Sequence, residues 1–226
     1  DSVINTDFKL ENFFKTAGFR QSQGQDIILI SFDGYVTSEA DREAGLLRSH
    51  RWNPFHYIRR LPEFRIADVL SITTSLYPVD DAKDKIWPSS AGKLFLGLIL
   101  WMLDTENVTG KTPTFPYLLS IIGVEGGLTS WMKREIAQDY LSEDCLKQFN
   151  GFLSCPDETQ GSIKANLESP LGIFADKTVM NVMSGNDFDF RDLRRKGISV
   201  YVSVAPSNSK AYQDVMNLFF EQLIKE

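Results

Sequence analysis

Three short runs at the two ends of the chain constrain its fold more than any other feature. They are Ser2 to Thr6, Ile27 to Phe32 and Ile198 to Val204, and each has the length of a short strand. Three such strands are few for an independently stable open α/β sheet. Because a long segment with helical patterning separates the second run from the third, we expect an α/β unit that is interrupted by a helical insertion.

The insertion is indicated by apolar residues at spacings of three and four. One apolar face, Phe64 to Leu76, ends at Tyr77-Pro78, and a broader face, Trp87 to Met102, predicts a helix at the centre of this body. The segments Asp33 to His50 and Asp104 to Thr112 are predicted to be loops.

Capping residues predict further helices. The residues expected to start them are Thr114, which is followed by Pro116, then Thr129 or Ser130, and Ser142. Gln160 to Phe174 is expected to form the last helical stretch of the body. Val215 to Leu223 predicts one amphipathic helix after the third strand.

Composition sets broad limits on function. The chain has 226 residues, a formal net charge of −6 and a pI near 5.1, so it has no general attraction for a phosphate backbone. Protein partners are therefore the default expectation. Cys145 and Cys155 are expected to be reduced packing residues of an intracellular protein. The apolar run Leu94 to Leu103 is about half the length of a membrane span, so this segment is not expected to cross a membrane.

Three short motifs favour no chemistry. Gly110-Lys111-Thr112 lacks the first glycine of a phosphate loop and follows a predicted helix rather than a strand. Ser90-Ala91-Gly92-Lys93 has the spacing of a serine acyl-enzyme motif but lies inside the predicted central helix, without its companion elements. His50 and His56 have no neighbouring cysteine or carboxylate spacing that suits zinc.

A charged cluster follows the first strand run. Asp7, Lys9 and Glu11 stand at the carboxyl edge of the expected sheet, where open α/β sheets bind ligands. Spacing alone supports two interpretations equally, a ligand site and solvated charges at the end of a strand.

A basic cluster precedes the third strand run. It consists of Arg191, Arg194, Arg195 and Lys196. Such a cluster can contact the phosphates of a nucleotide on a neighbouring subunit, or nucleic acid. The interpretation favoured by the sequence is a surface charge run that is partly balanced by Asp187, Asp189 and Asp192.

The order of these segments resembles the coupling ATPases of type IV secretion and conjugation systems, the TraG-like family. The matching segments are SVINTDFKLENFFKTAGFR, WNPF, Leu76-Tyr77-Pro78 with IWPSSAGKLFLGLILWML, GSIKANLESPLGIF, and NDFDFRDLRRKGISVYVSVAP. The resemblance implies a mainly α chain in which an all-alpha domain is inserted between strands of a partial RecA-like α/β nucleotide-binding domain. The implied domains are a motor segment with a loop at 1–60, an all-alpha substrate-recognition domain at 61–185, and a return to the motor at 186–226.

Two departures from the family pattern bear on catalysis. The phosphate loop is expected before Asp1 and the acidic Walker B strand after Glu226, so the segment is expected to be inactive and to bind no cofactor alone. ATP and Mg²⁺ are implied for the longer parent protein. Leu10 stands where the family's first motif usually has glycine.

The resemblance also implies a place of action. The parent would be a hexameric ATPase anchored at the cytoplasmic face of the bacterial inner membrane, and the segment alone a soluble monomer. Its helical domain would recruit secreted effector proteins, or dock a regulatory or chaperone protein, in a system that could be of the Cag type. The alternative is a DNA-guiding module of a conjugative ATPase. On this reading Asp7, Lys9 and Glu11 lie near nucleotide, Arg191, Arg194 and Arg195 lie at a subunit interface, and no metal site is expected. An independent small enzyme ranks last, because the two histidines and two cysteines provide no nucleophile with a matching base.

Overall fold

The structure is a computed structural model that describes residues 1–34, 38–44, 46, 48–79 and 85–226. It divides into two compact units, of which the first combines Asp1–Asn53 with Asp176–Glu226 and the second is Pro54–Ala175. The helical unit is therefore one continuous segment between the two halves of the other unit. The expected boundaries were at residues 60 and 185, later than those of the compact unit in both cases.

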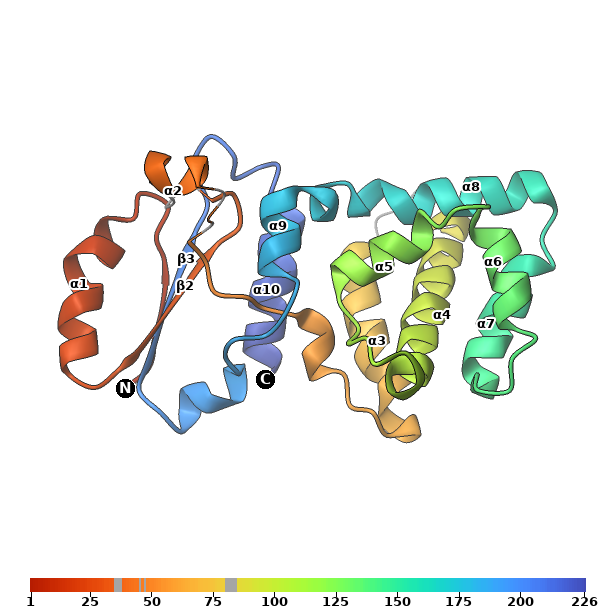
Figure 1. Cartoon of the computed structure of the whole chain (residues 1–226), viewed down its shortest axis with the longest axis horizontal. Coiled ribbons are helices and arrows are strands. Elements are labelled where there is room, and N and C mark those ends of the chain that lie inside the picture. The colour runs from red at the N-terminus through yellow and green to blue at the C-terminus, as the bar shows by residue number, and fades with distance from the viewer. Residues whose placement is uncertain (35–37, 45, 47, 80–84) are drawn as a thin grey trace. The chain divides into compact units, whose positions relative to one another are not determined.

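The first unit contains a parallel sheet of three strands (Figure 1). The strands are β1 (Val3–Thr6), β2 (Asp26–Ser31) and β3 (Ile198–Ser203), and their order is β1-β3-β2. Every residue of β3 is buried because β3 is the central strand. The three strand predictions are confirmed. The sheet is completed by pairing over a large sequence separation, with Val3 opposite Ser199 and Asp26 opposite Ile198.

Helices cover the sheet of this unit. Helix α1 (Glu11–Ser22) connects β1 to β2, and its Phe13 and Ala17 pack against a buried cluster of Leu10, Leu29 and Tyr201. The other helices are α2 (Glu39–Glu43), α9 (Lys177–Val182) and α10 (Gln213–Lys225).

An aromatic cluster joins the two sequence halves of this unit. The Trp52 ring lies 4.9 Å from the Phe219 ring of α10, and Phe190 lies 5.2 Å from the same ring. The indole N–H of Trp52 also donates to Gln222 Oε1 at 3.1 Å. Edge-to-face aromatic pairs of this kind add about 1 kcal/mol each beyond simple burial. Trp52, the first residue of the Trp-Asn-Pro-Phe segment, is thus held in the core of this unit.

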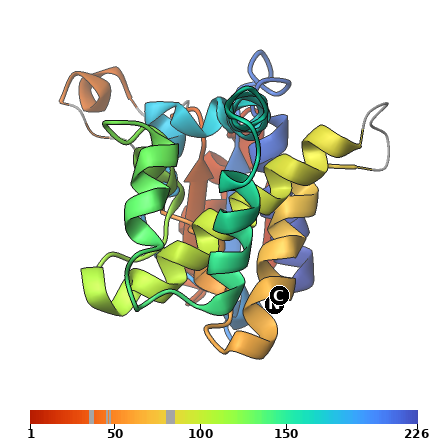
Figure 2. The same ribbon diagram turned by 90° about the vertical axis from the view of Figure 1, so that its right-hand side faces the viewer.

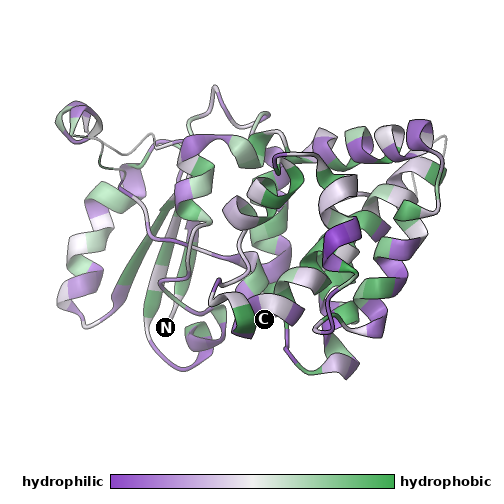
Figure 3. Ribbon diagram, turned by 45° about the vertical axis from the view of Figure 1, so that its right-hand side comes forward, coloured by the Kyte–Doolittle hydropathy of each residue, from purple (hydrophilic) through white to green (hydrophobic). Residues whose placement is uncertain are grey.

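The second unit is a helical bundle built around α4. Its helices are α3 (Pro62–Leu76), α4 (Ile86–Thr109), α5 (Phe115–Ile122), α6 (Leu128–Glu135), α7 (Glu143–Leu153) and α8 (Asp157–Glu168). Helix α4 contacts α3, α5, α7 and α8, and in Figure 2 it runs in yellow-green diagonally through the middle of these helices. The expectation of a central helix is confirmed. In Figure 3 the strands carry mostly hydrophobic residues, whereas the helices carry both hydrophilic and hydrophobic residues.

Two glycines allow neighbouring helices to approach α4 closely. A Cβ atom added to Gly92 would lie 2.9 Å from Thr73 Cγ2 of α3, and one added to Gly97 would lie 2.8 Å from Gln148 Cβ of α7. Real Cβ atoms essentially never approach other atoms so closely. The absence of a side chain at these two positions therefore sets the distances from α4 to α3 and α7.

The end of α4 differs from the sequence prediction. The segment from Asp104 was expected to be a loop, but the helix continues to Thr109 and ends at Gly110, whose φ is 67°. The reason is a buried ion pair, because Asp104 Oδ1 accepts from Arg65 Nη1 of α3 at 2.6 Å. The other oxygen of Asp104 accepts from the N–H and the hydroxyl of Ser142.

The capping predictions had mixed outcomes. Thr114 and Ser142 cap α5 and α7 with their side-chain oxygens, as expected. The cap of α6 was wrong, because the helix begins after Gly127 and the Thr129 hydroxyl donates to Gln160. The last helical stretch of the body was expected over Gln160 to Phe174. It is helical but not one continuous α-helix, because α8 ends at Glu168 and two short 3₁₀ helices follow over 169–171 and 173–175.

Two further expectations concern the segment Asp33 to His50 and the apolar helix α4. The segment Asp33 to His50 was expected to be a loop, but it contains α2, and residues 35–37, 45 and 47 of it lie outside the described residues. One helix in the described part of the chain, α4, is long and apolar enough to cross a membrane, but most of its apolar stretch is buried inside the protein, as expected of the core helix of the bundle.

Candidate functional site

Asp7 lies at the carboxyl edge of the sheet, directly after β1. Its side chain is 4% exposed, and its Oδ2 accepts from the backbone N–H of Phe13 in the first turn of α1 at 2.7 Å. Its own N–H donates to the carbonyl of Val202 in β3. Asp7 therefore holds the start of α1 against the end of β3, which is a capping role.

Leu10 has an unusual backbone conformation just before α1. Its φ is 58° and its ψ is 15°, and in the described part of the chain it is the one residue other than glycine with positive φ. The left-handed region costs about 1–2 kcal/mol for a residue with a Cβ. The side chain is 3% exposed and packs against Leu29 and Tyr201, which offsets this cost.

The other two candidates after β1 face solvent. Lys9 and Glu11 are exposed, and Glu11 forms an exposed ion pair with Lys15 at 3.5 Å. The structure therefore does not gather the three predicted charges into one pocket. Asp7 is turned into the protein, while Lys9 and Glu11 are accessible at the surface of the same edge.

A second acidic residue at the carboxyl edge was missed by sequence reasoning. Asp33 follows β2, and its Oδ2 accepts from Ala205 N at 2.7 Å and from Asn208 Nδ2 at 3.1 Å. It thereby fixes the loop after β3. An acidic residue that directly follows an apolar strand run was the available signal, and it is the same signal that identified Asp7.

Two buried hydroxyl groups lie near the carboxyl ends of β2 and β3. Ser31 and Ser203 are partners in the strand register and are 1% and 0% exposed. Within the described residues, neither hydroxyl has a hydrogen-bond partner. Buried polar groups are normally satisfied, so this edge has unmet hydrogen-bonding capacity.

The basic cluster forms a turn at the amino edge of the sheet; we call residues 191–196 the basic turn. The 3₁₀ helix Phe190–Arg194 opens it, and Ile198 begins β3 directly after it. The hydroxyl of Ser2, next to the start of β1, lies 2.6 Å from the carbonyl of Leu193 and 2.7 Å from that of Lys196. The basic turn is therefore fastened to the starts of both strands (Figure 1).

Part of the charge in the basic turn is balanced. Arg191 pairs with Asp189 at 2.7 Å, and Lys196 pairs with Asp192 at 3.0 Å, which raises the pKa of Lys196 through the hydrogen bond to that carboxylate. Arg194 and Arg195 are exposed and have no ion-pair partner among the residues that the structure describes.

The predicted role of Asp187 in balancing this cluster is wrong. Its carboxylate pairs instead with Arg51, at 2.7 Å, and also accepts from the Arg51 backbone N–H. The hydrogen bond to this guanidinium, opposed by partial burial, lowers the pKa of Asp187. Asp187 therefore links the segment that follows α9 to Arg51 and does not pair with the basic turn.

The two candidate clusters lie at opposite edges of the sheet. Asp7 follows β1, whereas the basic turn precedes β3, and the two strands are parallel. Successive residues advance about 3.3 Å along a strand, so about a full strand length separates the clusters.

The remaining motifs have structural roles. The His50 ring nitrogen accepts from Leu29 N at 3.1 Å on the outer edge of β2. The thiols of Cys145 and Cys155 donate to backbone carbonyls within the helical unit. Over the described residues there is no group of three or more His, Cys, Asp or Glu side chains that could hold a metal.

Comparison with known proteins places the chain in a family. Residues 1–225 match the family model described as type IV secretory system conjugative DNA transfer. Conjugal transfer protein TraG of Escherichia coli is 23% identical over 239 residues, which cover 99% of this chain and 35% of TraG. Protein VirD4 of Rhizobium radiobacter is 24% identical over 225 residues, which cover 99% of this chain and 30% of VirD4.

Structural similarity involves the same group of proteins. The bacterial conjugative coupling protein TrwB has a TM-score of 0.48 and 13% identity, over 96% of this chain and 48% of TrwB. TrwB has also been solved in complex with ADP and Mg²⁺. The chain spans about a third of the length of the curated relatives and about half the length of TrwB. Because the family model matches almost every residue, the chain belongs to the type IV secretory system conjugative DNA transfer family, the family of type IV coupling proteins.

Proposed function

We propose that this chain is the client-receiving part of a type IV coupling ATPase, and that its helical unit recruits secreted effector proteins. The observation that carries the proposal is the division of the chain: the helical unit is one continuous stretch of sequence that separates the two sequence halves of an α/β unit. An insertion with its own core can vary its surface for recognition without altering the sheet that carries it.

Charge supports a protein client over DNA. Within Pro54–Ala175, Asp and Glu outnumber Lys and Arg, and the whole chain has a formal net charge of −6. Binding to a phosphate backbone depends on neutralising phosphates with Lys and Arg. The acidic helical unit is therefore better suited to a protein than to nucleic acid. A regulatory or chaperone protein that docks on the same unit is a variant of this proposal.

The second candidate is a DNA-guiding function. It is favoured by the description of the family as conjugative DNA transfer and by the exposed side chains of Arg194 and Arg195 in the basic turn. Phosphate contacts of this kind need no particular base sequence. On this alternative the DNA would contact the α/β unit rather than the helical unit.

Fluorescence anisotropy of labelled DNA distinguishes the two functions. With the 226-residue chain at low salt, we expect flat titrations for both single-stranded and duplex DNA. Binding whose affinity falls linearly with the logarithm of salt concentration, and which Arg194→Ser with Arg195→Ser abolishes, would replace the protein-client proposal with the DNA function.

We assign the α/β unit to the nucleotide-binding part of the longer ATPase, with a RecA-like motor as its fold. In that protein Asp7, Lys9 and Glu11 would lie near the nucleotide edge, and Arg191, Arg194 and Arg195 would lie at the boundary between subunits. The opposite placement of the two clusters is consistent with a ring, proposed as a hexamer, in which one subunit supplies arginines to the site of the next.

The described residues do not fit ATP with Mg²⁺ on their own. The carboxylate of Asp7 is occupied by the start of α1, and no acidic cluster suited to a metal lies in the described ranges. The unpartnered Ser31 and Ser203 hydroxyls could bond a polar ligand but supply no charge. We therefore expect the 226-residue chain to show no ATP turnover above background. We also expect the chain to run as a monomer. Turnover by the purified chain would contradict this assignment. The membrane-anchored location belongs to the proposed longer protein.

A further inference from the structure

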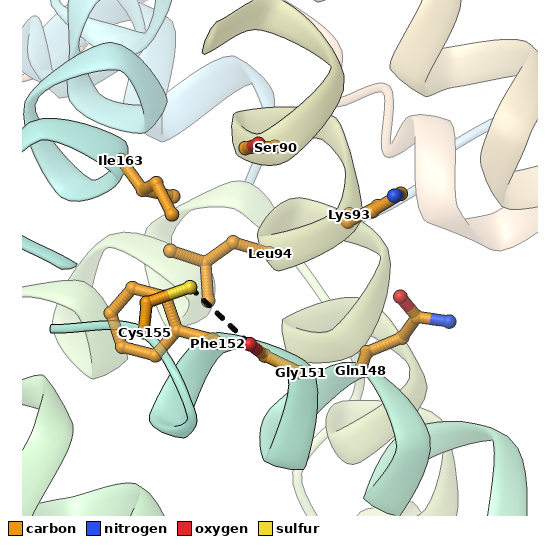
Figure 4. Close-up of a pocket in the computed structure, with 8 residues that line it drawn as sticks. All are labelled: Ser90, Lys93, Leu94, Gln148, Gly151, Phe152, Cys155 and Ile163. Carbon is orange, nitrogen blue, oxygen red and sulfur yellow. Dashed lines mark hydrogen bonds between the residues drawn. The ribbon is translucent and has the colours of Figure 1, made fainter. Parts of the chain in front are cut away.

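A pocket of about 210 Å³ lies between α4, α7 and α8 of the helical unit. Its inner wall is formed by Leu94, Phe152 and Ile163, which are 2%, 6% and 5% exposed. Figure 4 shows these side chains gathered on one side, while the polar ends of Lys93 and Gln148 extend on the other. The pocket therefore has an apolar wall and a polar rim.

Lys93 gives the rim a positive charge. It is exposed, and among the residues that the structure describes it is the one lining residue with a formal charge and it has no ion pair. The Gln148 amide at the same rim has no side-chain hydrogen bond within the described ranges either. Among the residues that the structure describes, no carboxylate lines the pocket. The rim therefore favours an anionic group that also accepts hydrogen bonds.

Gly151 keeps the pocket open at a cost to α7. It lies inside that helix and lines the pocket, and a Cβ atom added to it would meet no atom within 4 Å. Close packing against a neighbouring helix therefore does not explain why position 151 is a glycine, whereas it does explain Gly97 on α4. A glycine inside a helix is destabilising relative to alanine. Because glycine has no side chain, the space beside Gly151 in the pocket stays open.

We propose that this pocket receives a leucine-sized apolar side chain of a protein client, next to a carboxylate that binds Lys93 and Gln148. The proposal rests on the proposed function and names the chemistry that the helical unit recognises, an acidic residue adjacent to an apolar one. The volume suits one such side chain, since an apolar cavity of about 150 Å³ is known to hold benzene.

The size of the pocket favours a segment of polypeptide over a free small molecule. A ligand that fits about 210 Å³ has few atoms to contribute to binding. A client segment adds contacts outside the pocket, so the anchored side chain fixes its register rather than supplying all the affinity. This is the usual behaviour of an anchor residue in a pocket at a protein interface.

The pocket contains its own reporter. The Cys155 thiol lines it and is partly exposed, whereas Cys145 is fully buried and burial raises the pKa of its thiol. A maleimide reagent applied to the folded chain is therefore expected to label Cys155 selectively. An occupant of the pocket would slow this labelling, and the rate can be followed by mass spectrometry.

The test uses four probes on the 226-residue chain. They are acetyl-Gly-Glu-Leu-Gly-amide, the same peptide with Gln in place of Glu, the same peptide with Ala in place of Leu, and 4-methylpentanoate. We expect the Glu-Leu peptide to protect Cys155 most strongly, with the Gln peptide about twofold to fivefold weaker, as for an exposed ion pair. Equal protection by all three peptides, no protection at saturation, or equal protection by 4-methylpentanoate would overturn the proposal.

Variants separate the charge from the cavity. Lys93→Gln should reduce protection by the Glu-Leu peptide to the level of the Gln peptide. Gly151→Leu should fill the pocket and abolish protection by every peptide. The temperature of thermal unfolding should not fall, because leucine favours a helix more than glycine does and the added Cβ meets no atom within 4 Å. Protection that survives in Gly151→Leu would refute the pocket as the binding place.

Failure of this inference is distinguishable from failure of the proposed function. If the DNA titrations stay flat but the pocket variants bind the peptides normally, the protein-client function stands and the pocket assignment falls. Salt-dependent DNA binding would instead remove the protein-client function, whatever the labelling rates show.

Discussion

The left-handed backbone at Leu10 predicts an inverted order of stability for two substitutions. Replacing Leu10 by Ala or by Gly removes the buried isopropyl end of the side chain in both variants, which costs about 2–5 kcal/mol. The Ala variant keeps a Cβ atom in a conformation with φ of 58°, whereas glycine adopts it freely. At such positions glycine is favoured over alanine by about 1 kcal/mol, even after its greater freedom in the unfolded chain is included.

The assay is hydrogen exchange of the β2 and β3 amides, which reports the opening of the α/β unit without interference from the helical unit. We expect Leu10→Gly to be about 1 kcal/mol more stable than Leu10→Ala, with both below the parent chain. Gly18 in α1 supplies a matched control, since it has an ordinary helical backbone and open space around an added Cβ. There Gly18→Ala should raise stability, by about 0.5–1 kcal/mol. If Leu10→Ala proves as stable as Leu10→Gly, the strain argument is refuted.

Three further predictions concern the helical unit. Gly97→Ala should destabilise it by about 1–3 kcal/mol in urea unfolding, because the added Cβ would lie 2.8 Å from a Cβ of α7; unchanged stability would contradict the close packing. Asp104→Asn should cost about 3 kcal/mol in the same assay, because it leaves the Arg65 guanidinium buried without a counter-charge; a loss below about 0.5 kcal/mol would show that this pair is not needed. Burial and the hydrogen bond to Glu135 raise the pKa of Tyr140 to about 12, so its phenolate absorbance, isolated by difference from Tyr140→Phe, should appear near that pH. Because the folded-state pKa is raised, the contribution of Tyr140 to stability is complete below about pH 10 and is lost as the pH rises towards 12. A midpoint near 10 in the folded chain would contradict this assignment.

The strands and several helix starts were predictable because their signals are local. The apolar runs identified all three strands, and Thr114 and Ser142 are caps because a hydroxyl bonds a backbone N–H three residues away. The end of α4 was missed because Asp104 looks like a loop residue until its partner, 39 residues earlier, is known. Tertiary pairing overrode the local preference there.

Prediction of the candidate site from the sequence was limited in the same way, because contacts between distant residues decide its structure. The position of Asp7 at the strand end was found from sequence, but its burial depends on an N–H of α1. Asp33 was missed although the same signal marks it, and its backbone partner Ala205 lies 172 residues away. Contacts that close over such separations leave no pattern in neighbouring residues.

The outer edge of β2 has a consequence for how the sheet can grow. The backbone N–H and carbonyl of Leu29 are bonded to His50, and the N–H of Ser31 is bonded to Ser49. These bonds block strand addition on that side, as covered edges do in proteins that resist aggregation. Any additional parallel strand would therefore have to join beside β1, so the sheet has a single direction of extension and its existing order β1-β3-β2 would form one end of a larger sheet.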